Sequence, residues 1–388
     1  MSLEQIGFYT LSDARALNTS LKTPLQRCEL ILTDACNFKC PYCRGLKPGL
    51  KGSMPFKKAS AVVKHWTDER LRNIRFSGGE PTLYKGLANL VAQAKAGGVE
   101  RIAVSTNGSA PWSAYQELIN VGVNDFSISL DGCCSAVGDR MAGGIPGAWD
   151  TVVENIRRIS AKTYCTLGMV FTEQNIDHCV DAVAFAESLG VADIRVIPSA
   201  QYNQALIQLA ELGDAFLDKH PILKYRIKNI QNKRPVRGLN SGDPCKCWLA
   251  LDDMAIAGDY HFPCIIHLRE GGASIGKVGP NMRRERLEWI QRHVPSEDPI
   301  CKKNCLDVCS DYNHCAARTH SFDGLDLNVE LPSNYTKCPD CGNVEIEHGQ
   351  AFSTHRKPPS YDEVYCDECG WGFNVHTGHT KMPVRGYG

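Results

Sequence analysis

Short apolar runs alternate with longer amphipathic segments over residues 28–198. The short runs have the length and apolar content of buried strands, whereas segments such as Leu87, Leu90, Val91 and Ala94 repeat at helical spacing. This alternation predicts repeated strand–helix units around a parallel sheet. We expect six strands, at residues 28–33, 74–77, 101–106, 126–130, 164–170 and 194–197.

The strand signals stop near residue 200, and residues 201–240 predict helices and a linker. A run of basic residues lies there without an intervening acidic residue: Lys224, Arg226, Lys228, Lys233, Arg234 and Arg237. Such a run is usually a solvated face, and we expect that here. The alternative is contact with an anionic substrate such as a nucleotide or RNA.

The composition changes this picture mainly through cysteine. The chain has 388 residues, enough for two or three domains, and its 43 basic and 43 acidic residues give no global charge for nucleic acid or membrane. The N-terminal residues show no secretory leader, so we expect a cytoplasmic protein. In a reducing compartment, 19 cysteines predict metal binding rather than disulfides.

Cys36, Cys40 and Cys43 follow the first predicted strand with C-x3-C-x2-C spacing. Three such thiolates can hold three irons of a [4Fe–4S] cube and leave the fourth iron open to a small molecule. A zinc knuckle with a distant fourth ligand is the alternative. The segment Ser77-Gly-Gly-Glu-Pro81 favours the cluster, because adjacent glycines let the backbone approach a ligand and Glu80 can accept a hydrogen bond from an ammonium group.

The two motifs CNFKCPYC and SGGEP together resemble those of the radical S-adenosylmethionine (SAM) superfamily. The resemblance implies a partial (β/α)6 barrel with the site at the carboxyl ends of the strands. It also implies that Cys36, Cys40 and Cys43 ligate the cluster, and that SAM completes the open iron. An electron donor such as flavodoxin or ferredoxin would then drive cleavage of SAM to a 5′-deoxyadenosyl radical.

The same resemblance implies a set of SAM contacts. Tyr42 is expected at the adenine, and Gly78, Gly79 and Glu80 at the methionine amine. Polar residues after the third and fourth strands are expected at the ribose and carboxylate: Thr106, Asn107, Ser129 and Asp131. Ordinary turn chemistry is the alternative for these four, because Asn-Gly and Asp-Gly are common in turns.

A second group of seven cysteines lies between residues 245 and 315, and its order resembles the twitch or SPASM extensions that hold auxiliary [4Fe–4S] clusters. The sequence departs from the pattern of these extensions in two ways. The gap between Gly258 and the next cysteine is longer, and the last four cysteines have x3-x3-x5 spacing where SPASM has x2-x5-x3. The expected ligands of one auxiliary cluster are Cys247, Cys264, Cys309 and Cys315, with Cys245, Cys301 and Cys305 as possible replacements. Structural zinc is the alternative.

Two C-x2-C pairs near the C-terminus, Cys338 with Cys341 and Cys366 with Cys369, predict a zinc ribbon. The remaining five cysteines are expected to be structural thiols: Cys28, Cys133, Cys134, Cys165 and Cys179. The predicted organisation is a barrel core over residues 1–200, a helical linker over 201–240, an auxiliary-cluster domain over 241–330 and a zinc-ribbon tail over 331–388.

These features predict a radical SAM enzyme that abstracts hydrogen from its substrate. A peptide or protein substrate is slightly favoured. The alternative is a nucleotide or RNA, as in cyclase-like or tRNA-modifying chemistry. An explanation of a different class is a zinc protein without catalytic activity that binds partners.

Overall fold

The computed structural model describes residues 26–43, 45, 51–198, 203–279 and 281–317, together with four short strands near the C-terminus. A nine-stranded sheet with the order β6-β5-β4-β3-β2-β1-β7-β8-β9 organises residues 27–277. Strands β1 to β6 are parallel to their neighbours, as predicted. They span Arg27–Ile31, Asn73–Ser77, Arg101–Thr106, Asp125–Ser129, Tyr164–Phe171 and Asp193–Pro198.

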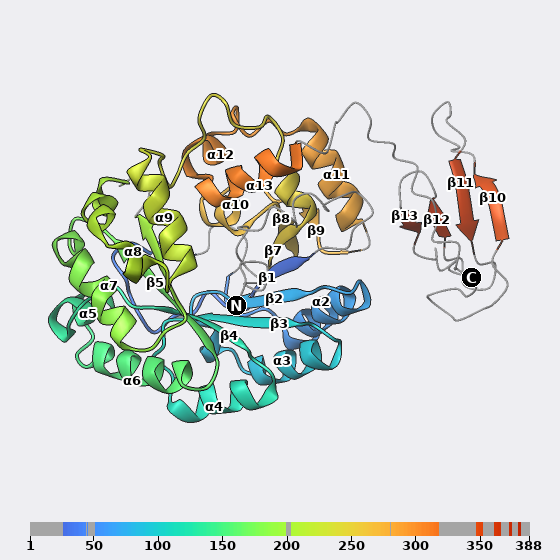
Figure 1. Ribbon diagram of the computed structural model, residues 1–388. Coiled ribbons are helices and arrows are strands. Elements are labelled where there is room, and N and C mark those ends of the chain that lie inside the picture. The colour runs from blue at the N-terminus through green and yellow to red at the C-terminus, as the bar shows by residue number, and fades with distance from the viewer. Residues whose placement is uncertain are drawn as a thin grey trace.

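Helices follow these strands and lie along the outer side of the curved sheet (Figure 1). Helix α6 shows why, because Val152, Val153, Ile156 and Ile159 form one buried stripe at helical spacing. The mixed α/β class with a parallel sheet is therefore confirmed. The elements that connect the six strands are α2 Phe56–Asp68, η2 Pro81–Leu83, α3 Leu87–Ala96, α4 Trp112–Val121, α5 Ser135–Met141, α6 Ala148–Ser160, η3 Ile176–His178 and α7 Cys179–Ser188.

The sheet continues beyond β1 into the cysteine-rich region. Strand β7 (Asp253–Ala257) pairs in parallel with β1, from Arg27 opposite Asp253 to Ile31 opposite Ala257. Strands β8 (Tyr260–Phe262) and β9 (Gly276–Lys277) then extend the sheet in antiparallel pairing. The residues expected to form a separate auxiliary domain are thus joined to the barrel by backbone hydrogen bonds.

Short helices complete the region between the barrel and residue 317. They are η4 Asn203–Glu211, α8 Asp214–Leu217, α9 Pro221–Gln231, η5 Trp248–Leu251, α10 Ile265–Arg269, α11 Met282–Arg292, α12 Pro299–Asn304 and α13 Asp307–Ala317. The basic run is not simply a solvated face. Arg226 of α9 is buried and pairs with Asp307, and Arg234 pairs with Asp311 at 2.6 Å. These pairs attach the helical linker to α13.

A buried guanidinium organises the cysteine-rich region. Arg286 of α11 is 2% exposed and donates hydrogen bonds to the carbonyl oxygens of Ala250, Asp253, Phe262 and Pro263. Burial lowers the pKa of Arg286 to about 10, which still leaves it charged at neutral pH. The Arg286 side chain therefore fixes the backbone just before β7, at the start of β7 and at the end of β8.

Near the C-terminus a four-stranded antiparallel sheet contains β10 Glu347–Ala351, β11 Tyr361–Tyr365, β12 Gly372–Asn374 and β13 His379–Lys381. Cys338, Cys341, Cys366 and Cys369 lie outside the described residues, so the zinc ribbon stays a prediction. Among the helices that the structure describes, none has the length and apolar character needed to cross a membrane.

Replacing Arg286 by Met is expected to destabilise the metal-free protein by about 3 kcal/mol or more, because several buried carbonyl groups lose their donor. The midpoint of urea unfolding, followed by circular dichroism, measures the loss. Arg284→Gln on the exposed side of the same helix is the matched control, and its midpoint should stay near that of the wild type. Equal midpoints for both variants would show that Arg286 does not have this structural role.

Candidate metal and cofactor site

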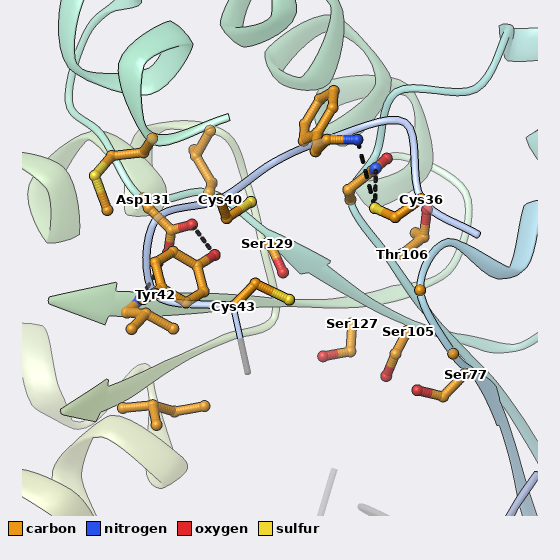
Figure 2. A pocket seen from close by; sticks show the side chains of 18 of the residues that line it. Cys36, Cys40, Tyr42, Cys43, Ser77, Ser105, Thr106, Ser127, Ser129 and Asp131 are labelled. Carbon is orange, nitrogen blue, oxygen red and sulfur yellow. Dashed lines mark hydrogen bonds between the residues drawn. The ribbon is translucent and has the colours of Figure 1, made fainter. Parts of the chain in front are cut away.

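A cavity of about 500 Å³ opens at the carboxyl ends of the parallel strands. Figure 2 shows side chains from the cysteine loop and from β2, β3 and β4 on its wall. Ten of the eleven residues predicted to hold the first cluster and SAM line it: Cys36, Cys40, Tyr42, Cys43, Gly78, Gly79, Thr106, Asn107, Ser129 and Asp131. Residues that are far apart in the sequence are therefore brought to one site, as expected for the ends of parallel strands.

The sulfur atoms of Cys36, Cys40 and Cys43 are turned toward the same space (Figure 2). Three thiolates from one short loop match the ligand set of a [4Fe–4S] cluster with one open iron. A single zinc ion with a fourth ligand stays the alternative. Elsewhere among the described residues, His267, Asp298 and Cys301 bring ligand atoms within 4.8 Å of one another.

The metal-free thiols of Cys36 and Cys40 are stable in their protonated form. Burial raises the pKa of the Cys36 thiol and raises that of Cys40 to about 12. The thiolate is the form that ligates a metal, and a strong positive charge nearby lowers the pKa of a thiol. Bound iron would supply that charge to these two side chains.

Gly78 and Gly79 hold the loop after β2 against the start of the cysteine loop. The Gly79 amide donates to the Thr33 carbonyl oxygen at 2.7 Å, and the Glu80 amide donates to the Ala35 carbonyl oxygen at 2.8 Å. A Cβ atom on Gly78 would lie 2.4 Å from the Thr33 oxygen, and one on Gly79 would lie 2.3 Å from the Ala35 oxygen. The glycines therefore permit a close contact between two backbones, in addition to lining the cavity.

Glu80 is fully buried, and it is absent from the cavity wall. Its carboxylate accepts hydrogen bonds from the Thr82 and Thr106 hydroxyls at 2.6 and 2.7 Å, and from the Asn107 amide at 2.7 Å. Burial raises the pKa of Glu80, and these hydrogen bonds oppose the rise. Glu80 therefore ties the end of β3 to the loop after β2, and its expected contact with an ammonium group stays a prediction.

Asn107 links the end of β3 to the cysteine loop. Its side-chain amide donates to the Asn37 Oδ1 atom at 2.8 Å and lies 3.9 Å from the Cys36 sulfur. The backbone amide of Asn107 is fixed by Glu80. A polar side chain is thus held next to the first cysteine of the motif.

Tyr42 and Asp131 form a pair on the opposite side of the cysteine loop. The Tyr42 hydroxyl donates to Asp131 Oδ2 at 2.5 Å, and Asp131 Oδ1 accepts from the Val170 amide at 2.7 Å. Burial raises the pKa of Asp131 to about 6. Tyr42 is therefore positioned by the end of β4, and Ser129 lies nearby with an exposed hydroxyl group.

The sequence analysis missed the arginines deeper in the barrel. Arg75 and Arg195 line the cavity beside Ser77, Ser105 and Ser127 (Figure 2 shows the serines). Side chains alternate between the two faces of a strand, so the place of Arg75 two residues before Ser77 was a signal for it. Arg269 carried no such signal, whereas Arg237, which also lines the cavity, belongs to the basic run.

A second group of thiols lies in the cysteine-rich region. Cys247, Cys264, Cys301, Cys305 and Cys309 affect one another electrostatically, which places them close together. Burial raises the pKa of Cys247 to about 11 and also raises those of Cys264 and Cys301. A hydrogen bond with Cys309 raises the pKa of Cys305 and lowers that of Cys309.

The other cysteines differ in burial. Cys315 is buried in an apolar cluster with Trp248 and Tyr312, against which Cys247 and Cys309 also pack, and Cys245 is exposed. Of the five scattered cysteines, Cys28, Cys165 and Cys179 belong to the main core, as expected of structural thiols. Cys133 and Cys134 are less buried and their sulfurs lie 3.7 Å apart.

Comparisons with known proteins agree with this geometry. Residues 30–186 match the family model described as "Radical SAM superfamily". The chain is 27% identical over 171 residues to a probable GTP 3′,8-cyclase of Sulfurisphaera tokodaii, covering 43% of this chain and 53% of that protein. It is 26% identical over 243 residues to the GTP 3′,8-cyclase of Aeromonas hydrophila subsp. hydrophila, covering 59% of this chain and 68% of that protein.

The chain spans about half the length of several curated relatives that it matches, among them the Sulfurisphaera protein. Among solved structures, native anSMEcpe with bound AdoMet and Cp18Cys peptide aligns with a TM-score of 0.54 and 15% identity. That alignment covers 76% of this chain and 96% of the other. At this identity the two chains share a fold.

Asp131 gives the metal-free protein a defined pH dependence. Its pKa in the folded protein is about 6, above the ordinary value of 3.8, so the folded state binds the proton more tightly than the unfolded state. The stabilisation is present below pH 4 and is lost as the pH rises to about 6. This difference corresponds to roughly 3 kcal/mol.

As the pH rises from 4 to 7, the free energy of unfolding of Asp131→Asn is therefore expected to increase by up to about 3 kcal/mol relative to that of the wild type. Urea unfolding of both proteins at the two pH values measures the change. Asp68→Asn, at an exposed position, is the control and should show little shift. If the free energies of unfolding of Asp131→Asn and the wild type differ by the same amount at both pH values, the raised pKa of Asp131 is contradicted.

Proposed function

We propose that the chain is a radical SAM enzyme, and the family match over residues 30–186 supports this. The observation that carries the proposal is the convergence of three thiols with Gly78 and Gly79 on one cavity at the strand ends. In this proposal Cys36, Cys40 and Cys43 hold a [4Fe–4S] cluster and SAM fills the adjoining space. Bound there, these groups supply reductive cleavage of SAM to a 5′-deoxyadenosyl radical that abstracts hydrogen from the substrate.

The protein's own residues position these groups. Asn107 and Ser129 offer polar contacts to the ribose and carboxylate, and Tyr42 offers an aromatic face to the adenine. Gly78 and Gly79 present backbone groups to the methionine amine, while Glu80 acts as a positioning residue beneath Thr106 and Asn107. Asp131 holds Tyr42 in place.

We further propose that the cysteine-rich region holds an auxiliary [4Fe–4S] cluster through Cys247, Cys264, Cys305 and Cys309, with Cys301 as the alternative to Cys305. The electrostatic effects of these thiols on one another support this set. Cys315, expected from the sequence, belongs to the apolar cluster against which Cys247 and Cys309 pack, and it is the alternative fourth ligand. The neighbours of two of them, Ile265 and Leu306, line the same cavity as the motif cysteines. The auxiliary group would then lie next to the substrate.

The substrate class remains a choice between two candidates. A peptide or protein, slightly favoured from the sequence, is consistent with the fold shared with anSMEcpe, whose solved structure contains a peptide. A nucleotide or RNA is consistent with the curated cyclases, which are named for GTP. An electron donor such as flavodoxin or ferredoxin, a cytoplasmic location and zinc in the tail complete the proposal.

Cys36→Ala should abolish the production of 5′-deoxyadenosine. The assay uses the anaerobically purified chain with dithionite and SAM, and chromatography measures the product. Cys165→Ala, in the core away from the cavity, is the matched control and should retain production per folded protein. A wild type that contains zinc but neither iron nor sulfide, and that produces no deoxyadenosine, would support the alternative of a zinc protein without catalytic activity.

The auxiliary ligands are tested in a background in which Cys36, Cys40 and Cys43 are all alanine. This variant should keep about four irons per chain, as one cubic cluster requires. Adding Cys305→Ser or Cys264→Ser should lower the iron content strongly, whereas adding Cys315→Ser should not. Loss of iron with Cys315→Ser alone would restore the set expected from the sequence, and zinc in place of iron would indicate a structural site.

A further inference from the structure

Three metal-binding side chains of the cysteine-rich region meet between α10 and α12. The ligand atoms of His267, Asp298 and Cys301 lie within 4.8 Å of one another. His267 belongs to α10, whereas Asp298 immediately precedes α12 and Cys301 lies in its first turn. We refer to these three side chains as the mixed-ligand group. It combines an imidazole, a carboxylate and a thiol, which are the side-chain groups that bind zinc in proteins.

The His267 ring is buried and tightly packed. Its side chain is 6% exposed, and a Cβ atom on Gly272 would lie 2.2 Å from the ring Nδ1 atom. The Gly272 amide also donates to the His267 carbonyl oxygen at 2.8 Å. The ring of Trp289 meets the His267 ring at 80°, with centroids 6.2 Å apart. Since Nδ1 lies against the backbone of Gly272, Nε2 is the nitrogen that His267 presents to the mixed-ligand group.

Asp298 divides its two carboxylate oxygens between two tasks. Oδ1 accepts hydrogen bonds from the amides of Ile300 and Cys301, both at 2.8 Å, and so caps α12. Oδ2 instead lies 3.5 Å from His267 Nε2. This distance is long for a hydrogen bond between nitrogen and oxygen. It matches the separation of about 3.3–3.6 Å between two ligand atoms of one tetrahedral zinc ion, each about 2.0–2.2 Å from the metal.

A fourth metal-binding side chain lies next to Cys301. The Nε2 atom of His293, at the end of α11, is 3.5 Å from the Cys301 sulfur. The His293 ring stacks on Trp289 with centroids 3.9 Å apart. A closed tetrahedral zinc site needs four protein ligands, whereas a site with three keeps one position for water. His293 is therefore a candidate for the fourth ligand.

The mixed-ligand group adjoins the second group of thiols. Cys247 and Cys264 affect Cys301 electrostatically. Cys264 directly precedes α10, and Cys305 directly follows α12. An ion bound by the mixed-ligand group would therefore connect two helices whose ends carry two of the proposed auxiliary ligands.

We propose that His267, Asp298 and Cys301 bind a single zinc ion, with His293 or a water molecule as the fourth ligand. A thiolate among nitrogen and oxygen ligands suits zinc better than magnesium or calcium, which prefer oxygen ligands only. Cys301 is then a zinc ligand rather than a replacement for Cys305. The zinc would also fix α10 relative to α12, and its benefit to the auxiliary cluster rests on the proposed function.

Metal analysis of the anaerobically purified full chain tests this inference by counting zinc and iron in the same samples. His267→Gln should contain about one zinc fewer per chain than the wild type, as a mononuclear site requires. Zinc at the predicted ribbon is common to both proteins and cancels in the comparison. Asp298→Asn should show the same loss. Because asparagine also caps helices, Asp298→Asn is the second variant in case His267→Gln fails to fold.

His65→Gln is the matched control, because the partly exposed His65 pairs with Glu69 at the end of α2. Its zinc content should equal that of the wild type. The inference is overturned if folded His267→Gln and Asp298→Asn retain as much zinc as His65→Gln. It is also overturned if these variants lose iron but no zinc, which would assign the group to an iron site. Zinc loss in the variants of a wild type that produces no deoxyadenosine would support the zinc site and contradict the proposed function.

Discussion

The site depends on a contact between two backbones that excludes side chains. The amides of Gly79 and Glu80 donate hydrogen bonds to the carbonyl oxygens of Thr33 and Ala35, and a Cβ atom on Gly78 or Gly79 would have no room. This contact fixes where the cysteine loop begins. Cys36, the first motif cysteine, directly follows Ala35 and so lies next to this contact.

Buried charges extend this fixed point to the rest of the molecule. Glu80 ties the end of β3 to the loop after β2, and Arg286 ties the segments around β7 and β8 together. Arg226 and Asp307 join α9 to α13. Each of these groups is costly to bury alone and is compensated by several hydrogen bonds or by an opposite charge. Buried charged groups therefore connect the elements on both the barrel side and the cysteine-rich side.

Local patterns predicted the part of the structure that local forces determine. The apolar runs located β1 to β6 within a few residues, and polar residues such as Asn107 and Asp131 at strand ends identified the cavity. The pairing of β7 with β1 could not be predicted, because a short apolar run does not specify which edge it joins. The burial of Glu80 was also hidden, since its partners Thr106 and Asn107 are distant in sequence. Arg226 looked like a surface residue for the same reason.

The pairing of β1 with β7 has a consequence for how the chain is made. During synthesis β1 gains its β2 neighbour early, but its other edge stays unpaired until residues 253–257 have left the ribosome. An open apolar edge is a template for unwanted association. The segment matched by the family model, residues 30–186, therefore contains β2 but lacks β7, the second strand that flanks β1 in the folded protein.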